Sequence, residues 1–405
     1  MQHRLWEVVW LMFKLGALSW GGPAAHIALM EQMVVTRRRW LSREQFLDLL
    51  GVTNLIPGPN STEMAIHCSY QRAGWPGLVL GGIAFILPAA GITLAWAWLY
   101  RAYGVTPGWA PWWMGIRAVV LAILVQAVWR LGRSAAKGPR LLLIGVAVLA
   151  AALLGVPPVI AILSGGVVGM LLLAWPARPG PSGGGAGAAL LAAPAGGSIA
   201  GGGIAGGGMA LHAAVAGAAG AVAGAATAVQ ALSLTSLAWV FLKIGMVLFG
   251  SGYVLVAYLQ DELVAARGWL TGQQLLDAVA AGQITPGPVL STATFVGFQM
   301  AGLAGAVVAT VAIFLPGFVL VALVSPWVAV LRRSRWSARF LDAVNMSAVA
   351  LMAAAVVWLA RGTWLDWRPV LLSALALALL WRGVSPLLLI LLGSVAGFLL
   401  SLVPF

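Results

Sequence analysis

The 405-residue chain is 61% hydrophobic and 8% charged, with a mean hydropathy of +0.98, a composition that excludes an ordinary soluble globular protein and indicates a polytopic membrane protein. Lys and Arg outnumber Asp and Glu by 23 to 10, but they gather in short runs, which favours positive-inside loops over a nucleic-acid-binding surface. The single cysteine, Cys68, excludes an internal disulfide and a cysteine-cluster metal site.

The first apolar segment spans residues 5–33 and is interrupted by Gly21, Gly22 and Pro23. It has no evident small-residue cleavage site, so we expect it to be retained and not removed as a signal peptide. The loop that follows is basic and contains Arg37, Arg38, Arg39 and Arg43.

A Pro-Gly-Pro sequence then interrupts the apolar pattern, within NLIPGPNSTEMAIH at residues 54–67. Pro57 and Pro59 lack an amide hydrogen and Gly58 is conformationally loose, so a helix cannot continue through them. In lipid, the unpaired backbone groups of such a break are tolerated only where they line protein or water. The amides after Pro59 and the positive end of the next helix dipole favour an anion. The break therefore predicts a binding site.

Two half-length helices are expected around this break, at residues 45–56 and 60–71. Each is too short to cross about 30 Å of hydrocarbon at about 1.5 Å per residue, so together they predict a re-entrant hairpin. Further apolar segments follow at residues 77–100, 112–129, 141–154 and 158–175.

Residues 176–232 differ from the rest of the chain, because they are rich in Gly, Ala, Pro and Ser and contain no aromatic residue. Such a stretch buries little apolar surface, so we expect a flexible linker. A helix over its Ala-rich part, residues 209–229, is the alternative.

After the linker, the pattern of the first half starts again. The break recurs in QITPGPVLSTAT, as Pro286, Gly287 and Pro288. At the same spacing, Lys14, Gly16, Gly21, Trp40, Leu41, Gln45 and Asp48 return as Lys243, Gly245, Gly250, Trp269, Leu270, Gln274 and Asp277. After a single deletion, Gln71, Gly74, Gly77 and Pro88 return as Gln299, Gly302, Gly305 and Pro316. Chance does not produce this register, so the sequence indicates an internal duplication.

Equivalent loops of the two halves differ in charge. After the first segment, four Arg residues in the first half correspond to Arg267, beside Asp261 and Glu262, in the second. After the third element the bias reverses, from Arg101 alone to Arg332, Arg333, Arg335 and Arg339. The next loop contains Arg130, Arg133, Lys137 and Arg140 in the first half, and Arg361 and Arg368 in the second. Under the positive-inside rule, the two halves are predicted to have opposite orientations.

Opposite orientation requires an odd number of membrane crossings in each half. About five spanning helices plus one broken re-entrant hairpin satisfy this, as do seven crossings if the hairpin spans. We therefore expect an all-α polytopic membrane protein with two inverted-topology repeats, residues 1–175 and 233–405. The linker at residues 176–232 then lies in the cytoplasm, and both termini lie outside.

Several of these sequences resemble one known family. They are KLGALSWGGPAAHI, RRRWL and the first Pro-Gly-Pro element, together with KIGMVLFGSGYVL, WLT and GQITPGPVLSTATFVGF. They resemble the long-chain chromate ion transporters over nearly the whole chain outside the linker. The resemblance implies a multi-pass protein of the bacterial inner membrane that exports chromate, driven by the proton gradient, with sulfate as an alternative substrate.

A tetrahedral dianion needs fixed donors and positive charge, which act strongly at low dielectric. Lys14 and Lys243 lie inside the first segment of each half and Arg117 inside a later one, where charge is usually functional. We expect one of them to face the anion. The alternative for the lysines is snorkelling, or pairing with Asp48 and Asp277. The donors expected from the two breaks are Asn60, Ser61, Thr62, Thr285, Ser291 and Thr292.

Glu63 and His67 lie four residues apart, on one face of the second half-helix. Either group can take up a proton when it is buried. We expect Glu63 to carry the coupling proton; pairing with Arg72 or Arg117, or capping of the half-helix, is the structural alternative. The Glu63 carboxylate also departs from the family pattern, in which small residues follow the first break.

Two other classes of function compete with a proton-coupled transporter. An anion channel would use the same half-helix ends, but without proton dependence. An enzyme acting on a phosphorylated lipid is disfavoured, because the sequence shows no Ser/His/Asp or paired-carboxylate set. We expect no catalytic residue, metal or cofactor, and we expect an oxyanion, protons and the lipid bilayer as partners.

Overall fold

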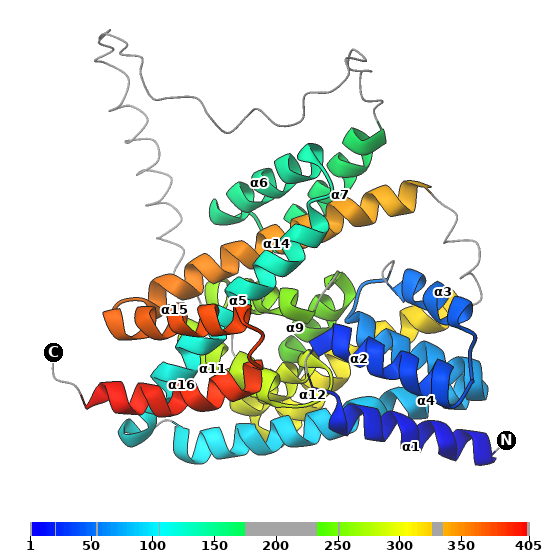
Figure 1. Cartoon of the computed structure of the whole chain (residues 1–405), viewed down its shortest axis with the longest axis horizontal. Coiled ribbons are helices and arrows are strands. Elements are labelled where there is room, and N and C mark those ends of the chain that lie inside the picture. Colours follow the sequence, from blue (N-terminus) through cyan, green and yellow to red (C-terminus); the bar gives the residue numbers. More distant parts are fainter. Residues whose placement is uncertain are drawn as a thin grey trace, which may run out of the picture. The chain divides into compact units, whose positions relative to one another are not determined.

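The computed structural model describes residues 2–20, 22–53, 56–104, 106–174, 233–249, 252–325 and 335–402. The expected linker at residues 176–232, and the alternative of a helix at 209–229, lie outside these residues. The described residues form helices and contain no β-strand, as expected for an all-α membrane protein (Figure 1).

The helices of the first half are α1 (Gln2–Leu18), α2 (Gly22–Met30), α3 (Arg43–Thr53), α4 (Asn60–Leu99), α5 (Ala110–Ala135), α6 (Pro139–Leu153) and α7 (Pro158–Ala174). Those of the second half are α9 (Leu234–Val247), α10 (Leu255–Leu259), α11 (Gly272–Ile284), α12 (Thr292–Val324), α14 (Arg335–Thr363), α15 (Trp367–Trp381) and α16 (Pro386–Ser401).

Among the described residues, four helices are long and apolar enough to cross a membrane: Asn60–Gly104, Ala110–Ala135, Val289–Val324 and Ala338–Thr363. Five more apolar helices, α6, α7, α9, α15 and α16, have only 10–17 residues. A single straight crossing takes about 20 residues, so these helices are short for a span. The number of crossings in each half therefore remains a prediction.

Both Pro-Gly-Pro sequences break the helical backbone. In the first half α3 ends at Thr53 and α4 begins at Asn60, directly after Pro59. In the second half α11 ends at Ile284, and a short 3₁₀ turn from Val289 to Ser291 leads into α12.

The helices after the two breaks bend at matching places. Gly74 in α4 has φ 64° and ψ −151°, and Gly302 in α12 has φ 61° and ψ −149°. These left-handed values are accessible to glycine and strained for other residues. The helical run that starts at Asn60 is therefore short, close to the expected 60–71.

Each break is tied to the other half by one backbone hydrogen bond. The amide of Gly58 donates to the carbonyl of Leu248 at 2.5 Å, and the amide of Gly287 donates to the carbonyl of Ser19 at 3.0 Å. Ser19 and Leu248 are the residues that follow α1 and α9. The two bonds are thus reciprocal, because both the donors and the acceptors occupy equivalent positions of the two halves.

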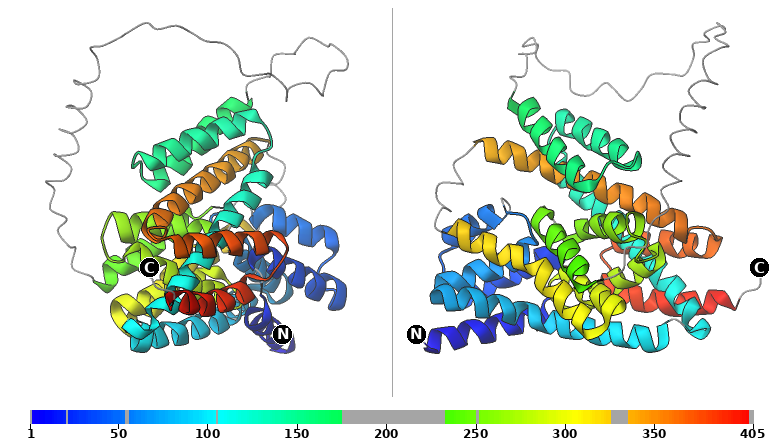
Figure 2. Two further views of the ribbon diagram at one scale, coloured as in Figure 1. Left: turned by 60° about the vertical axis from the view of Figure 1, so that its left-hand side comes forward. Right: turned by 180° about the vertical axis from the view of Figure 1, so that it is seen from behind.

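The later helices of the two halves interleave. Helix α5 packs against α15 and α16 of the second half, while α14 packs against α6 and α7 of the first (Figures 1 and 2). Glycines permit the closest approaches: Gly115 of α5 meets the backbone of Gly393 in α16. The helices of both halves therefore belong to one compact unit.

Replacing Gly115 with Ala is expected to destabilise the protein. A Cβ atom there would lie 1.8 Å from the carbonyl oxygen of Gly393, so α5 and α16 would have to separate. Overpacking of this kind costs about 1–3 kcal/mol, measurable as a lower midpoint of thermal unfolding in detergent. Gly91→Ala is the matched control, because Gly91 lies in α4 with no atom within 4 Å of an added Cβ atom, and Ala favours helix. Equal midpoints for the two variants would contradict this packing.

Candidate functional site

A cavity of about 960 Å³ lies where the two breaks come together. Asn60 lines it from the first break. Gln283, Thr285, Gly287 and Val289 line it from the second. The two sequence elements that predicted a site therefore border one space, although they belong to different halves of the chain.

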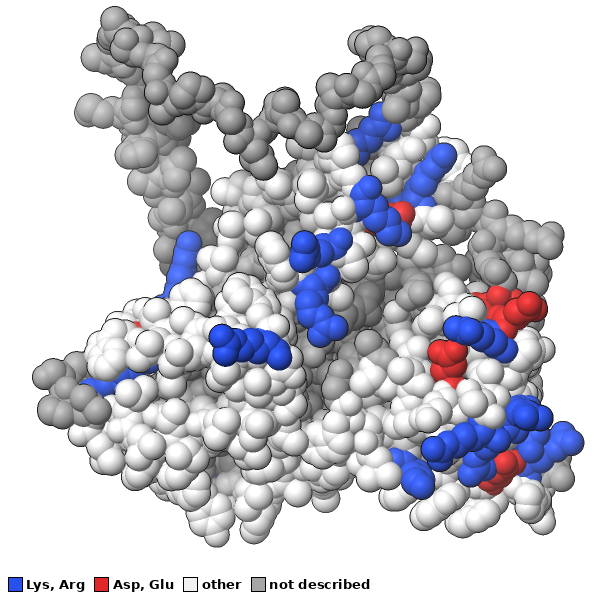
Figure 3. Space-filling view, in the orientation of Figure 1, with Lys and Arg blue, Asp and Glu red and all other residues white. Residues whose placement is uncertain are grey.

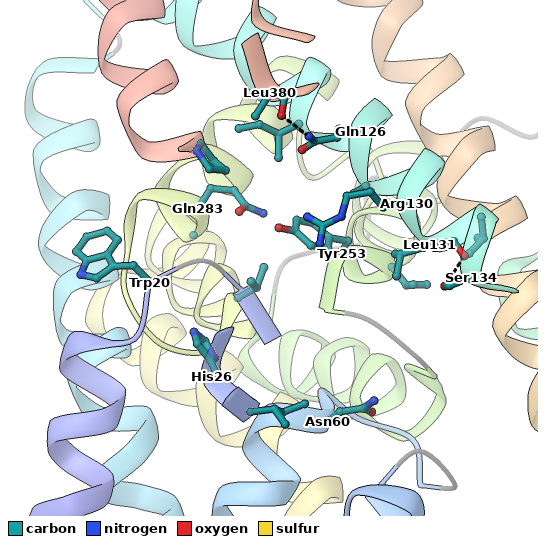
Figure 4. A pocket seen from close by; sticks show the side chains of 18 of the residues that line it. Trp20, His26, Asn60, Gln126, Arg130, Leu131, Ser134, Tyr253, Gln283 and Leu380 are labelled. Atoms are coloured by element: carbon teal, nitrogen blue, oxygen red, sulfur yellow. Dashed lines mark hydrogen bonds between the residues drawn. The ribbon is translucent and has the colours of Figure 1, made fainter. Parts of the chain in front are cut away.

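The other walls come from both halves. Residues next to the interruptions of the first segments contribute Ser19, Trp20, His26 and Tyr253, and α5 contributes Gln126, Arg130 and Ser134 (Figure 4). The remaining polar wall is formed by Asn345 of α14 and the turn between α15 and α16.

Three residues that line the cavity have a buried polar atom without a hydrogen-bond partner among the described residues. Ser19 Oγ, His26 Nδ1 and Gln283 Nε2 are buried and make no hydrogen bond to another described residue. The second ring nitrogen of His26, Nε2, lies 3.1 Å from the carbonyl oxygen of Ser19. Buried polar groups are normally hydrogen-bonded, so these unpaired atoms favour a polar occupant beside them.

Arg130 supplies positive charge to the cavity. Its side chain is exposed there and forms no ion pair with another described residue. Figure 4 shows it pointing toward Tyr253 and Gln283, and its charge acts on the Tyr253 phenol. At the rim, Lys137 pairs with Asp342 at 2.7 Å. Figure 3, in the orientation of Figure 1, shows a hollow in the surface of the molecule with basic side chains along its edge.

The comparison with known proteins decides the family. The model of the chromate transporter family matches residues 6–170 and residues 235–398. The chain belongs to the chromate transporter family. The resemblance drawn from its motifs is confirmed, and members of this family are transporters and not enzymes. The family and the apolar helices make the chain a multi-pass membrane protein.

Three relatives show how far the similarity extends. The chain is 30% identical over 401 residues to the probable chromate transport protein of Synechococcus elongatus, covering 98% of this chain and 95% of the relative. It is 29% identical to the chromate transport protein of Cupriavidus metallidurans, covering 94% and 88%. It is 31% identical to that of Pseudomonas aeruginosa, covering 86% and 80%. No solved structure matches the chain.

In this chromate transporter homologue, Arg117 binds an acid and does not line the cavity. Its Nε and Nη2 atoms donate to the two carboxylate oxygens of Asp277, each at 2.7 Å. Tyr100 donates to the same carboxylate at 2.8 Å. The Asp277 side chain is fully buried, so this bidentate pair fixes α11 to α5 without lining the cavity.

The two expected lysines also lie away from the cavity lining. Lys14 is exposed on α1. Lys243 pairs with Glu262, which also receives Arg267. Asp277 pairs with Arg117, and Lys243 pairs with Glu262. Of the alternatives considered for the lysines, the exposed position of Lys14 is compatible with snorkelling.

The hydroxyl groups of the breaks divide into two groups. Thr285 lines the cavity, and Thr93 of α4 donates to it at 3.3 Å and to Ser291 at 3.0 Å. Thr292 donates to the carbonyl of Val289 at 2.8 Å. Ser61 and Thr62 are buried beside Asn60 but outside the lining. Of the residues that form the two breaks, Pro57, Gly58, Pro59, Pro286, Gly287 and Pro288, only Gly287 lines the cavity.

Glu63 and His67 belong to α4 and are fully buried. Neither carboxylate oxygen of Glu63 has a hydrogen-bond partner among the described residues, and the carboxyl group packs against Gly58 and Gly317. His67 Nδ1 lies 3.2 Å from Ser325 Oγ. The cations that were alternatives for Glu63 pair elsewhere, because Arg72 binds Glu7 at 2.8 Å and Arg117 binds Asp277.

The described residues contain no group of three His, Cys, Asp or Glu side chains placed to hold a metal ion. Arg130, Tyr253 and Gln283 line the cavity but are not among the candidates from the sequence. The charge pattern predicts a loop at Arg130, whereas α5 continues to Ala135 and places Arg130 inside the helix. The longer helix is the signal that would have found it.

Proposed function

We propose that the protein exports chromate across the inner membrane of a bacterial cell, as a secondary transporter coupled to the proton gradient. The observation that carries the proposal is the cavity shared by the two breaks, which is lined by the cation Arg130 and by residues with unpaired polar atoms. A tetrahedral dianion matches this chemistry. The curated relatives named as chromate transport proteins support chromate, and sulfate is the alternative with the same charge and shape.

The proposed architecture is a pair of inverted repeats, residues 1–175 and 233–405, each with a re-entrant break. Its support is the family model's match to each half, the matching bends at Gly74 and Gly302, and the reciprocal hydrogen bonds of Gly58 and Gly287. The opposite basic bias of equivalent loops supports the inversion. Transporters of this kind bind substrate where the repeats meet.

The rim of the cavity lies on the side from which an exporter loads its anion. The cavity is lined at its rim by Lys137, Asp342 and Gly383. These residues lie in or beside loops that the charge pattern predicts to be cytoplasmic. A cavity open to the cytoplasm loads its anion from inside the cell. Rocking of the two halves would then release the anion outside.

Glu63 is the proposed proton carrier. It lies three residues after the cavity residue Asn60, on the same helix. An isolated charged carboxylate is costly to bury, so its ionisation requires a change in its surroundings. When protonated it tolerates the anion, and when ionised it helps to expel it.

The test is uptake into inverted membrane vesicles energised by a proton gradient. Radiolabelled chromate and, separately, radiolabelled sulfate are supplied, with and without an uncoupler. Chromate accumulation that the uncoupler abolishes is the expected result. If neither anion accumulates while the protein is present and folded, the proposal is wrong.

The same assay separates a transporter from an anion channel. A channel lets the anion equilibrate with the membrane potential and does not respond to the pH gradient when that potential is clamped. A proton-coupled transporter accumulates chromate under a pH gradient alone.

A further inference from the structure

We propose that Arg130, together with Gln283 and Tyr253, forms the oxyanion-binding site, so that the substrate binds at the second break and not equally at both. This inference rests on the proposed function, since it names the residues that hold the anion in the same cavity. All three side chains line that cavity.

Arg130 is suited to this role because it forms no ion pair with an acid in the part of the chain that the structure describes. The other basic groups near the site have partners: Lys137 binds Asp342, and Arg117 binds Asp277. Arg133, one turn further along α5, lies over the ring of Trp129 with its guanidinium carbon 5.4 Å from the ring centre. A planar guanidinium with several donors matches two oxygens of a tetrahedral dianion.

Gln283 and Tyr253 add donors from the second half. The side-chain Nε2 of Gln283 is buried and donates to no other described residue. Figure 4 shows Gln283, Tyr253 and Arg130 pointing toward one another, with His26 and Asn60 on the other side of the cavity. Three kinds of donor thus converge from α5, α11 and the turn before α10.

The first break offers less to an anion. It contributes Asn60 to the cavity lining, whereas the second contributes four residues. The Glu63 carboxyl group already packs against Gly58, and the second half has Thr292 at the matching position of its repeat. An acid at the first break repels a dianion whenever it is ionised. At the position of the second half that corresponds to Arg130, the sequence has Trp358. The second half therefore has no basic residue equivalent to Arg130.

The experiment measures radiolabelled chromate binding to the purified full-length protein by equilibrium dialysis, beside uptake into vesicles. Arg130→Gln is expected to weaken binding at least about tenfold, as loss of a charge-assisted hydrogen bond does. Arg130→Lys keeps the positive charge but loses the planar guanidinium, so its chromate affinity should lie between those of the unchanged protein and Arg130→Gln. Arg133→Gln is the matched control, expected within about twofold of the unchanged protein.

A second pair of variants compares the two breaks. Gln283→Glu and Asn60→Asp each replace an amide by a carboxylate of the same size. Gln283→Glu is expected to weaken chromate binding more than about tenfold through like-charge repulsion, and Asn60→Asp by clearly less.

The outcomes separate this inference from the proposed function. If the unchanged protein binds and accumulates chromate but Arg130→Gln behaves like Arg133→Gln, the transporter stands and the Arg130 site is wrong. An Asn60→Asp effect as large as that of Gln283→Glu also overturns the assignment to the second break. If the unchanged protein binds neither chromate nor sulfate, both proposals fail. Gln283 lies on α11 and Asn60 on α4, whereas Arg130 lies on α5. The Gln283 and Asn60 variants therefore still compare the two breaks if Arg130→Gln does not fold.

Discussion

Glu63→Gln is expected to remove the dependence of chromate transport on the pH gradient. Glu63 is fully buried, and both of its carboxylate oxygens lack a hydrogen-bond partner among the described residues. Gln has the same shape but is always neutral, so it fits between Gly58 and Gly317 without exchanging a proton. Accumulation driven by a pH gradient should fall at least about tenfold, which corresponds to about 1.4 kcal/mol.

The control for this variant is Glu44→Gln, the same chemical change at an exposed position of α3. It should leave the pH dependence intact. Chromate exchange at equal pH on both sides should survive in Glu63→Gln, which shows that the protein is folded. A Glu63→Gln protein that still accumulates chromate in response to a pH gradient would rule Glu63 out as the proton carrier.

Among the single substitutions considered for stability, Asp277→Asn is expected to lower the free energy of unfolding the most. The Asp277 carboxylate accepts three hydrogen bonds, two from Arg117 and one from Tyr100. The substitution leaves the Arg117 charge without its partner at the junction of α5 and α11. Breaking a buried pair in this way costs about 3–5 kcal/mol. The midpoint of thermal unfolding in detergent should fall by more than about 5 °C.

Asp342→Asn provides the comparison, because Asp342 and Lys137 also lie 2.7 Å apart, but with Lys137 exposed and Asp342 only half-buried. Exposed pairs contribute about 0–1 kcal/mol, so this variant should unfold close to the unchanged protein. Replacing both Arg117 and Asp277 with Met and Leu should recover part of the stability. Equal midpoints for Asp277→Asn and Asp342→Asn would contradict a structural role for the buried pair.

The breaks in the helices were predictable because they depend on local chemistry. Each break has two prolines, one on either side of a glycine, and this local combination ends a helix, whereas a single proline such as Pro88 lies inside α4. The helix start at Asn60 follows from the same rule, and the structure places it at that residue. The order of the apolar segments was predictable because a run of apolar residues is also a local property of the sequence.

The partners of charged residues were not predictable, since they depend on distant segments. Arg117 and Asp277 lie 160 positions apart, and they meet only because α5 packs beside α11. Glu7 binds both Arg38 and Arg72, a contact that no local pattern indicates. The basic neighbours of Arg130 predict a loop, and only the extent of α5 in the structure shows that Arg130 faces the cavity.

The interleaving of the two halves was also beyond the sequence. A duplication predicts that the halves have similar folds, but not which helices pack together. Gly115 and Gly393 explain how α5 and α16 approach so closely, and this becomes clear only once both are placed.

The central claim is that two oppositely oriented halves enclose one oxyanion cavity, and the accessibility of single cysteines tests it most directly. Thr36 and Ala265 are exposed, occupy equivalent positions of the two halves, and can each be replaced by Cys. The native Cys68 is buried and should not react. A membrane-impermeant maleimide added to intact spheroplasts is predicted to label Ala265→Cys, and to label Thr36→Cys only after the membrane is broken. Labelling of both from the same side would contradict the inverted architecture.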